Sequence, residues 1–293
     1  MLPAAEAVSH GAITIVNAMA TGRGAALGIG LQTRAIVRVT NRSGVFIARN
    51  LSDPQENTKL AKAAAQSVFS RFGVDKRFGA IIETDSNIPI AVGLKSSSAA
   101  SNAVALASLR ALGRKVGDAE VVKLGVQASF KAGVTLTGAF DDACACYFGG
   151  VVVTDNVRRR ILRRFRPDRG LRVLIQVPKA KKYTRDVDPG SFRTIKPFIQ
   201  AANRSALRGD YWNSMTFNGL VYSMALGYDT RAATTALDAG AVAAGLSGKG
   251  PAVAAVVPNS KRANVRAAWR RIEGQVIETS LNFRKATARE LSP

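Results

Sequence analysis

Two adjacent aspartates, Asp141 and Asp142, stand in an otherwise apolar run of small residues, TGAFDDACACYFGG. Carboxylates are costly in such surroundings unless water solvates them or a reaction uses them. The chain holds a single histidine and two cysteines, which nearly excludes a Ser-His-Asp triad or a His-rich metal site. A general base must then be a carboxylate. The pair is a candidate for proton transfer, with a solvated turn as the ordinary alternative.

A second polar cluster, PIAVGLKSSSAA, begins at Pro89, where an apolar segment gives way to an alanine-rich helix. Gly93 allows a tight turn, and the serines place hydroxyls and backbone N–H groups at the helix N-terminus, which suits a phosphate. Lys95 adds positive charge. The order differs from the GxxxxGK[ST] loop, and a serine-rich helix cap is the alternative. The candidate ATP- and phosphate-binding residues are Pro89, Gly93, Leu94, Lys95, Ser96, Ser97, Ser98, Ala99 and Ala100.

The third candidate segment is the loop GLSGKGP at residues 245–251, immediately before a predicted strand at Ala252–Val257. Glycines at alternating positions let the main chain approach a ligand closely. A plain turn is the alternative interpretation for this loop taken alone.

Taken in this order and spacing, the three segments resemble the small-molecule kinases of the GHMP superfamily, which include galactokinase, homoserine kinase, mevalonate kinase and phosphomevalonate kinase. The PxxxGLGSSAA phosphate loop of that family is matched by Pro89–Ala100, and its SGxGP loop by Ser247–Pro251. Its later aspartate stands seven residues before a glycine pair, as Asp142 does before Gly149. The matching segments span most of the chain.

Within the superfamily, the local sequence is most similar to the archaeal-type shikimate kinases. GLKSSSA (with lysine in place of the usual glycine at its third position), the N-terminal GAITIVNAMATGRGAALGI and TGAFDDAC carry this resemblance. It implies phosphorylation of shikimate to shikimate 3-phosphate with ATP and Mg²⁺, on the route to chorismate and the aromatic amino acids. Homoserine kinase, or another GHMP small-molecule kinase, is the nearest alternative.

The resemblance also implies roles for individual residues. The ATP phosphates would lie over Gly93–Ala100, and Ser97 matches the family's Mg²⁺-coordinating serine. Asp142 matches the aspartate that takes the proton from the attacking hydroxyl, with Asp141 as the alternative base or an orienting partner. Such a base need not be strong, because phosphoryl transfer relies mainly on positioning and charge neutralisation. If both carboxylates were ionised at close range, the pKa of one should rise.

Two positions depart from the family pattern. Relatives often carry a metal-ligating glutamate eleven residues before the aspartate, where this chain has Lys131. Asp141 or Glu120 would then have to supply the second metal ligand. The usual lysine of the first motif is missing from His10–Asn17. Its phosphate-neutralising role would pass to one of three basic residues, Lys95, Arg23 and Lys249.

Shikimate is a small carboxylated triol, so its carboxylate requires arginine or lysine and its hydroxyls require polar partners. The candidate substrate-binding residues lie in three loops: Arg23, Lys182, Thr184, Arg185, Ser247, Gly248, Lys249 and Gly250. For each basic residue in this set, ordinary surface charge is an equally good explanation. Asn17, inside an apolar run, bonds either a ligand or the backbone, and His10 is expected to be a structural histidine.

The composition is strongly basic, with 42 Lys+Arg against 20 Asp+Glu and a net charge of +22. This balance favours anionic partners. The densest cluster, RRRILRRFRPDR from Arg158 to Arg169, is interpreted as a solvated surface or inter-domain linker, with RNA contact as the alternative. A basic RNA-binding protein is therefore the competing class. It leaves Asp141, Asp142 and the SGKGP loop unexplained, and the interleaved aromatics expected for base stacking are missing.

Apolar periodicity predicts the elements that must position these segments. Strands are predicted at 12–19, 34–40, 80–84, 147–154, 171–177, 252–257 and 275–279, and helices at 58–72, 99–112, 118–132, 194–207, 211–226, 231–243 and 261–272. The glycine-rich TGRGAALGIG is expected to be a loop or a bulged hairpin. The irregular alternation of strands and helices indicates an α+β protein of two domains rather than a doubly wound sheet.

The resemblance specifies the two domains further. It implies an N-terminal ribosomal-protein-S5-domain-2-like domain at 1–160, which binds ATP, and a C-terminal ferredoxin-like αβ domain at 161–293. The chain has no run of roughly 18–20 apolar residues and no basic segment before its apolar N-terminus, so a cytoplasmic protein without membrane partners is expected. The sequence leaves open whether it is a monomer or a homodimer. Cys144 and Cys146 suit neither a disulfide framework nor a four-ligand zinc site.

Overall fold

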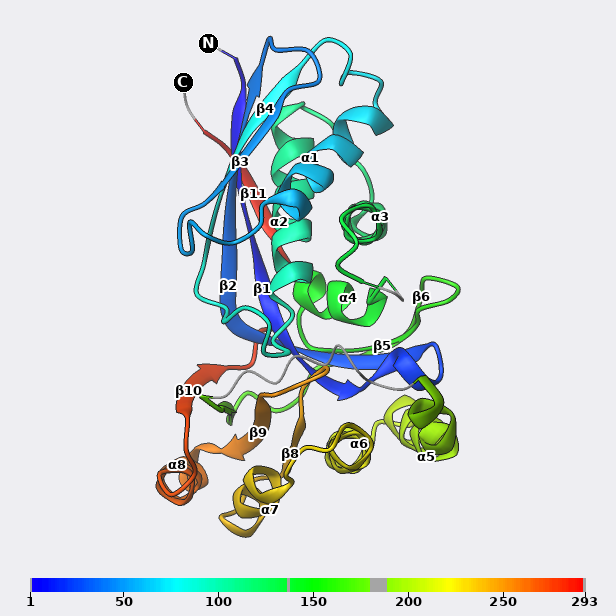
Figure 1. Ribbon diagram of the computed structural model, residues 1–293, viewed down its shortest axis with the longest axis vertical. Helices are drawn as coiled ribbons and strands as arrows, with labels where there is room; N and C mark the ends of the chain where they lie inside the picture. The colour runs from blue at the N-terminus through cyan, green and yellow to red at the C-terminus, as the bar shows by residue number, and fades with distance from the viewer. Residues whose placement is uncertain (1, 136–137, 180–188, 292–293) are drawn as a thin grey trace.

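The computed structural model describes residues 2–135, 138–179 and 189–291. It arranges them as two β-sheets with their helices (Figure 1). The larger sheet and helices α1–α4 form the upper part of Figure 1, and the smaller sheet with α5–α8 forms the lower part. Two sheets with mixed helix and strand content confirm the α+β prediction. Within the described residues, no helix combines the length and apolarity that crossing a membrane requires.

The larger sheet has seven strands, in the order β11-β1-β2-β4-β3, with β5 paired to β2 and β6 to β5. Its centre is the long antiparallel pair of β1 and β2. The first and last strands of the chain are neighbours, because β11 pairs with β1. The strands are β1 (Ala4–Val16), β2 (Arg23–Thr40), β3 (Phe46–Asn50), β4 (Gly79–Ser86), β5 (Val151–Asp155), β6 (Arg160–Phe165) and β11 (Thr287–Leu291).

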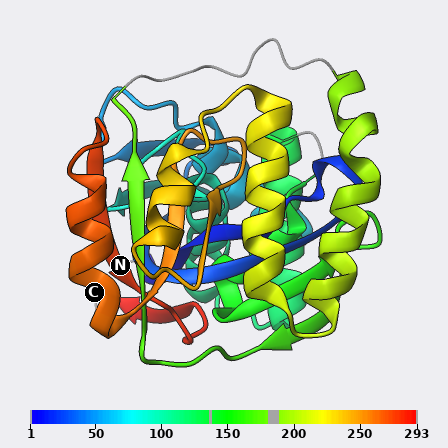
Figure 2. The same ribbon diagram turned by 90° about the horizontal axis from the view of Figure 1, so that it is seen from below.

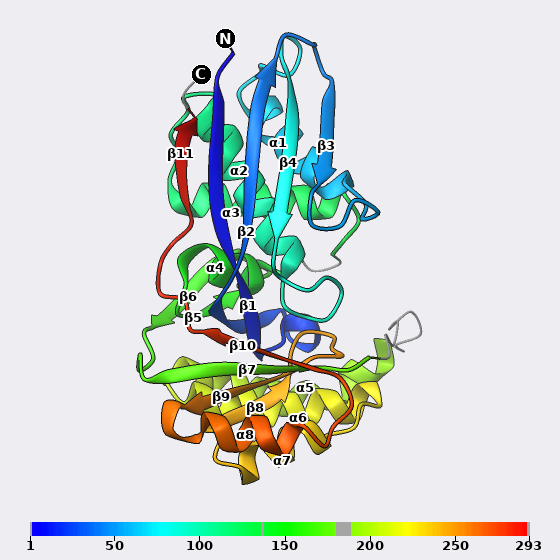
Figure 3. The same ribbon diagram turned by 90° about the vertical axis from the view of Figure 1, so that its left-hand side faces the viewer.

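Helices α1–α4 lie on one face of the larger sheet (Figure 3). They are α1 (Lys59–Arg71), α2 (Ser96–Ala111), α3 (Asp118–Lys131) and α4 (Phe140–Phe148). The sheet-facing side of α2 is made of small residues, with Ala99, Ala103 and Ala107 fully buried at a spacing of one helical turn. Small side chains let the helix lie close to β1 and β2. The N-terminus of α2 is thereby held at the end of the sheet that faces the smaller one.

The smaller sheet is antiparallel and has the order β10-β7-β9-β8. Its strands are β7 (Leu171–Val177), β8 (Ala243–Leu246), β9 (Val253–Pro258) and β10 (Gln275–Ser280), and its helices are α5 (Pro189–Leu207), α6 (Tyr211–Leu226), α7 (Arg231–Asp238) and α8 (Arg262–Trp269). The helices cover the outer face of the sheet (Figure 2). Two β-α-β units in the order β-α-β-β-α-β define a ferredoxin-like arrangement, as predicted for the C-terminal domain.

The two sheets share one core. The tip of the β1–β2 hairpin, a short 3₁₀ turn at Ala18–Ala20, reaches the helices of the smaller sheet, and the N–H of Ala20 donates to Tyr222 Oη on α6 at 3.1 Å. Buried side chains of β1, such as Ile13, belong to the same apolar cluster as Val173 of β7. The loops at this junction are therefore fixed by packing from both sheets.

The glycine-rich segment forms the bulged hairpin that was one of the two structures expected for it, because residues 23–30 are the first part of β2, which pairs with β1 across two register irregularities. Some local predictions were wrong. The arginine-rich segment is a solvated surface, as expected, but it is not a linker, because Arg160–Phe165 forms β6 and pairs with β5 while most of the arginines are exposed. Of the predicted strand 147–154, the first two residues belong to α4, and β3, β8 and β11 were missed. The domain division at residue 160 stays a prediction; it falls at the start of β6, a strand of the larger sheet.

Candidate active site

The N-terminus of α2 offers backbone N–H groups to an anion. The residue before the helix, Lys95, has a left-handed conformation with φ of 65° and caps no N–H group with its side chain. The first hydrogen bond of the helix runs from the N–H of Ala99 to the carbonyl of Lys95 at 3.0 Å, so the N–H groups of Ser96–Ser98 precede the helical ladder. A positive side chain opposes the dipole at a helix N-terminus, and a bound anion would relieve that conflict.

Lys95 forms an ion pair with Asp142. Its Nζ lies 3.0 Å from Asp142 Oδ1, and the two side chains are only 8% and 17% exposed. Limited access to water strengthens an interaction of this kind relative to a surface ion pair. The pair joins the loop before α2 to the first turn of α4, so it brings the predicted phosphate loop and the predicted base together.

Asp141 is the more buried member of the aspartate pair, with 4% exposure. Its Oδ1 accepts a hydrogen bond from Asn156 Nδ2 at 2.7 Å, and its N–H donates to Asn156 Oδ1 at 3.1 Å. Burial, followed by the negative charge of Asp142, raises the pKa of the Asp141 carboxyl to about 7, against the opposing influence of Lys95 and the Asn156 hydrogen bond. One raised pKa is what two neighbouring carboxylates require.

The short helix α4 places Asp141 against β2 of the β1–β2 hairpin and Asp142 against Lys95. It begins after Ala139, whose φ of 43° is left-handed, and it carries the two aspartates in its first turn. The carboxylate of Asp141 packs directly over Gly24 of β2, where a β-carbon would overlap it. Gly24 is thus the residue that makes room for the buried acid. Its place in the glycine-rich segment, which was expected to be a loop or a bulged hairpin, has a steric reason.

The glycine-rich loop between β8 and β9 is bonded to the loop before α2. Ser247 Oγ donates to the carbonyl of Gly93 at 2.8 Å and accepts from the N–H of Thr14 at 3.2 Å. Thr14 Oγ1 in turn accepts from the N–H of Gly248 at 2.9 Å. A β-carbon on Gly93, whose φ is 93°, would meet the carbonyl of Ser247. A β-carbon on Gly248 would lie 3.0 Å from Lys95 Nζ. The two predicted motifs therefore form one structural unit.

Asn17 holds the main chain around this unit. Its Nδ2 donates to the carbonyl of Gly248 at 3.0 Å and its Oδ1 accepts from the N–H of Met19 at 3.0 Å. Its own N–H donates to Asn218 Oδ1 at 2.9 Å. Asn17 was expected to bond either a ligand or the backbone, and in the structure it bonds the backbone.

Other predicted residues lie apart from this cluster or at its edge. Arg23 is 52% exposed and lies 3.6 Å from Asp155, and Lys249 is exposed. Lys182, Thr184 and Arg185 lie outside the described residues.

Glu120 lies 3.8 Å from Arg71 in an exposed pair, which leaves Asp141 as the better-placed of the two substitute ligands considered for the metal. His10 carries a buried Nδ1 without a partner among the described residues, and burial followed by the charge of Arg284 lowers its pKa.

Sequence reasoning missed Asn156 and Thr154. Thr154 Oγ1 donates to Asn156 Oδ1 at 2.6 Å, so the asparagine that holds Asp141 is itself held by the end of β5. The only signal in the sequence is the polar triplet TDN after the apolar run VVV, which is typical of any strand end.

The two cysteines are free and buried, and burial raises the pKa of both thiols, so they are not reactive groups of the site.

Comparison with known families defines the class of protein. Residues 59–150 match the family described as GHMP kinases N terminal domain, and residues 228–274 match GHMP kinases C terminal. The first match contains the loop before α2 and the aspartate pair, and the second contains the loop between β8 and β9. The chain belongs to the GHMP kinase family.

Within that family the chain is similar over almost its whole length to archaeal shikimate kinases. The shikimate kinase of Methanosarcina mazei is 44% identical, with 94% of this chain and 94% of the relative covered. The shikimate kinase of Pyrococcus furiosus is 43% identical, with 92% of this chain and 96% of the relative covered.

Solved structures confirm the fold. The mevalonate kinase of Methanococcus jannaschii has a TM-score of 0.77 at 16% identity and covers 94% of this chain and 98% of its own. A homoserine kinase from Cytophaga hutchinsonii has a TM-score of 0.75 at 16% identity and covers 98% of this chain and 97% of its own. At this level of identity the likeness establishes the two-domain architecture and does not distinguish substrates.

Proposed function

We propose that the protein is a kinase that transfers the γ-phosphoryl group of ATP to a hydroxyl of shikimate, yielding shikimate 3-phosphate. The observation that carries this proposal is the shielded Lys95–Asp142 pair at the N-terminus of α2. The pair places a positive charge that can bind phosphate beside a carboxylate that can accept the proton of a hydroxyl. The choice of shikimate as the substrate rests on the archaeal shikimate kinases, which match nearly the whole chain.

The chain's own groups divide the work of phosphoryl transfer. The N–H groups of Ser96–Ser98 and the charge of Lys95 receive the phosphates, since developing negative charge is stabilised by donors that are already oriented. Asp142 accepts the proton of the attacking hydroxyl. It is more accessible than Asp141, whose carboxylate is bonded to Asn156. Asp141 orients Asp142 and remains the alternative base, because its pKa of about 7 also suits proton transfer.

Lys95 is proposed to replace the lysine that other family members carry in their first motif. In this chain the first motif lies on β1, and the lysine comes instead from the loop before α2. Lys95 contacts Asp142, whereas Arg23 is paired with Asp155 and Lys249 points to solvent. Of the three basic candidates, only Lys95 joins the aspartate directly among the described contacts.

The oxygen donors at this site fit a magnesium ion carried in by ATP. Mg²⁺ takes one or two protein oxygens and completes its shell with phosphate oxygens and water. Ser97 is exposed in the first turn of α2, and Asp141 and Asp142 supply carboxylates. The described residues contain no group of three or more His, Cys, Asp or Glu side chains placed to hold a metal by themselves. The ion would neutralise phosphate charge, with Ser97 as its proposed protein ligand.

The substrate carboxylate is assigned to Arg23, at the start of β2 and next in the chain to Gly24, over which the Asp141 carboxylate packs. Its guanidinium is half-exposed at the hairpin tip and can form a bidentate pair with a carboxylate. Thr184 and Arg185, together with Ser247, Gly248, Lys249 and Gly250, remain proposed substrate contacts. The protein is proposed to act in the cytoplasm, as a monomer or homodimer.

A coupled ADP-release assay with shikimate, homoserine and mevalonate tests the proposal. Turnover that depends on shikimate is expected, and ³¹P NMR of the product identifies the phosphorylated hydroxyl. Turnover of homoserine without shikimate would make the protein a different GHMP kinase. Salt-dependent RNA binding, with no ATP turnover in the presence of shikimate, homoserine or mevalonate, would show that the protein does not act as a kinase on these substrates and would favour the RNA-binding class.

A further inference from the structure

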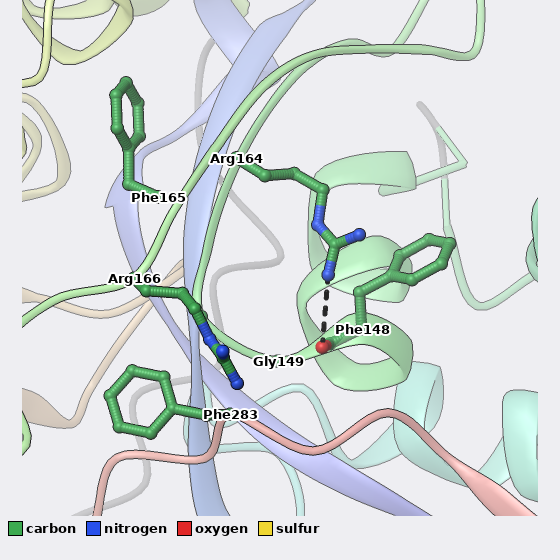
Figure 4. Close-up of a pocket in the computed structure, with 7 residues that line it drawn as sticks. Phe148, Gly149, Arg164, Phe165, Arg166 and Phe283 are labelled. Atoms are coloured by element: carbon green, nitrogen blue, oxygen red, sulfur yellow. Dashed lines mark hydrogen bonds between the residues drawn. The ribbon is translucent and has the colours of Figure 1, made fainter.

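A pocket outside the candidate active site lies at the C-terminal end of α4, opposite the aspartates in the first turn of that helix. Its volume is about 350 Å³, and Figure 4 shows it between the end of α4, strand β6 and the segment before β11. It is lined by Phe148, Gly149, Gly150, Arg164, Phe165, Arg166 and Phe283. The proposed phosphoryl transfer uses none of these residues.

Two guanidinium groups extend into the pocket. Arg164 lies near the end of β6 and Arg166 directly follows the strand, and Figure 4 shows both side chains extending toward Gly149. Arg164 Nη2 donates to the carbonyl of Phe148 at 3.5 Å. Among the residues that the structure describes, neither guanidinium lies within ion-pairing distance of an Asp or Glu oxygen. Their charges are oriented but not neutralised.

Aromatic rings hold these guanidinium groups in place. The Arg164 guanidinium lies 4.7 Å from the centroid of the Phe148 ring, and that of Arg166 lies 6.0 Å from the Phe283 ring. The ring of Phe165 points away from both (Figure 4) and packs against Tyr211 at 5.5 Å. The apolar walls of the pocket are therefore Phe148 and Phe283.

The floor of the pocket is fixed main chain. The N–H of Gly150 donates to the carbonyl of Asn282 at 2.7 Å, and its carbonyl accepts from the N–H of Gly28 at 3.0 Å. Side chains at Gly149 or Gly150 would collide with the main chain of Asn282 or Phe165. The glycine pair that follows the aspartates thus lets three segments meet here, and it leaves a concave surface that needs no rearrangement to receive a ligand.

We infer that this pocket binds a small carboxylate built on a single planar ring. Arginine presents a planar fork that pairs with a carboxylate through two parallel hydrogen bonds, and Phe148 and Phe283 form apolar walls beside the guanidinium groups, against which a ring packs. The volume is at the lower end of the range for small-molecule sites, roughly 300–1,000 Å³, so it suits one ring. A nucleic-acid strand needs a longer basic groove with several stacking platforms.

The test is calorimetric titration of the full chain with 3-phenylpropionate. Shikimate and a non-hydrolysable ATP analogue are kept at saturation, so that the active site is occupied. Propionate, which lacks the ring, and 3-phenylpropan-1-ol, which lacks the charge, are titrated in parallel. Binding of 3-phenylpropionate is expected, with affinity at least about tenfold above that of either truncated compound.

Matched variants locate the binding. Arg164→Ala and Arg166→Ala should each weaken 3-phenylpropionate binding by about tenfold or more while shikimate phosphorylation stays unchanged. Arg163→Ala removes the same charge from the same strand at an exposed position outside the pocket lining, and it should leave the affinity unchanged.

Four results would overturn the assignment. They are no binding by the wild type, binding of propionate or 3-phenylpropan-1-ol that equals that of 3-phenylpropionate, equal weakening by Arg163→Ala, and binding that is seen only when shikimate is left out. An oligouridylate that binds in an Arg166-dependent manner when 3-phenylpropionate does not bind would assign the pocket to nucleic acid instead. Unchanged phosphorylation in each variant shows that the protein is folded, and a failure here leaves the proposed kinase activity intact.

Discussion

Lys95 Nζ lies 3.0 Å from Asp142 Oδ1 in a pair whose side chains are 8% and 17% exposed. The lysine precedes α2 in a left-handed conformation, and the aspartate lies in the first turn of α4. The contact therefore ties the helix that is proposed to receive phosphate to the helix that carries the proposed base. In a shielded pair, loss of one partner leaves the other charge poorly solvated. Either charge should matter more here than in a surface ion pair.

Asp142→Asn should lower the turnover of shikimate by a factor of ~10² or more, the usual scale for loss of a general base. The amide keeps the shape of the side chain but accepts no proton. ATP binding should change little, because the N–H groups of Ser96–Ser98 are untouched. Titration with a fluorescent ATP analogue measures this binding. Near-normal turnover in this variant, with a large loss in Asp141→Asn, would transfer the role of base to Asp141.

Lys95→Gly separates the backbone role of Lys95 from the role of its charge. A left-handed φ of 65° strains any residue with a β-carbon, and glycine relieves that strain. The relieved strain should offset part of the stability lost with the shielded ion pair, so in urea titrations Lys95→Gly should be more stable than Lys95→Ala, which keeps the strain. The turnover of Lys95→Gly should still fall about tenfold or more, and its KM for ATP should rise, because the positive charge is gone. Lys95→Arg is the charge-retaining control, and equal losses in both variants would contradict a role based on charge.

The pKa of Asp141 makes stability depend on pH. That pKa is about 7 in the folded protein against an ordinary 3.8, so the folded state retains a proton that the unfolded chain releases. The resulting contribution to stability is fully present below the unfolded value and is lost as pH rises through the folded pKa.

Asp141→Asn cannot titrate and should remove this pH dependence. Between pH 5 and pH 8, the free energy of unfolding of the wild type should fall by about 2–3 kcal/mol more than that of the variant. Urea unfolding of both proteins at the two pH values measures the difference, and the other titrating groups cancel in the comparison. Parallel pH dependences would show that Asp141 ionises normally.

Asn156 is predicted to be a positioning residue for the aspartate pair. Asn156→Ala removes the donor to Asp141 Oδ1 and the acceptor of its N–H. The lost hydrogen bond lowered the Asp141 pKa, so the pKa should rise further and the stability transition should move to higher pH. Turnover should fall about tenfold with little change in either KM, and the protein should lose roughly 1–3 kcal/mol of stability. A lower melting temperature with unchanged turnover and unchanged pH dependence would reduce Asn156 to a structural role.

The phosphate loop and the glycine loop were predictable because each has a local pattern of residue types. Their contact was not, since the Ser247–Gly93 hydrogen bond joins segments distant in sequence. The same holds for β11, whose pairing with β1 unites the two ends of the chain. The arginine-rich strand β6 was misinterpreted because charged side chains follow its edge and only Ile161 and Phe165 pack against the core.

The close approach at Gly93 gives a prediction about how the two loops are held. Gly93→Ala places a β-carbon against the carbonyl of Ser247 as well as imposing a left-handed φ of 93° on alanine. Gly113→Ala is the matched control, because its φ is 63° and nothing lies within 4 Å of the new β-carbon. In urea titrations the control should lose only about 1–2 kcal/mol, the cost of the left-handed backbone.

Gly93→Ala should lose clearly more than this control, because the Ser247 carbonyl must move as well. Displacing that loop also moves Gly248 away from Lys95, so the KM for ATP should rise in Gly93→Ala and not in Gly113→Ala. Equal losses of stability in the two variants would mean that the backbone conformation alone requires glycine at this position. The contact with Ser247 would then contribute nothing to holding the phosphate loop.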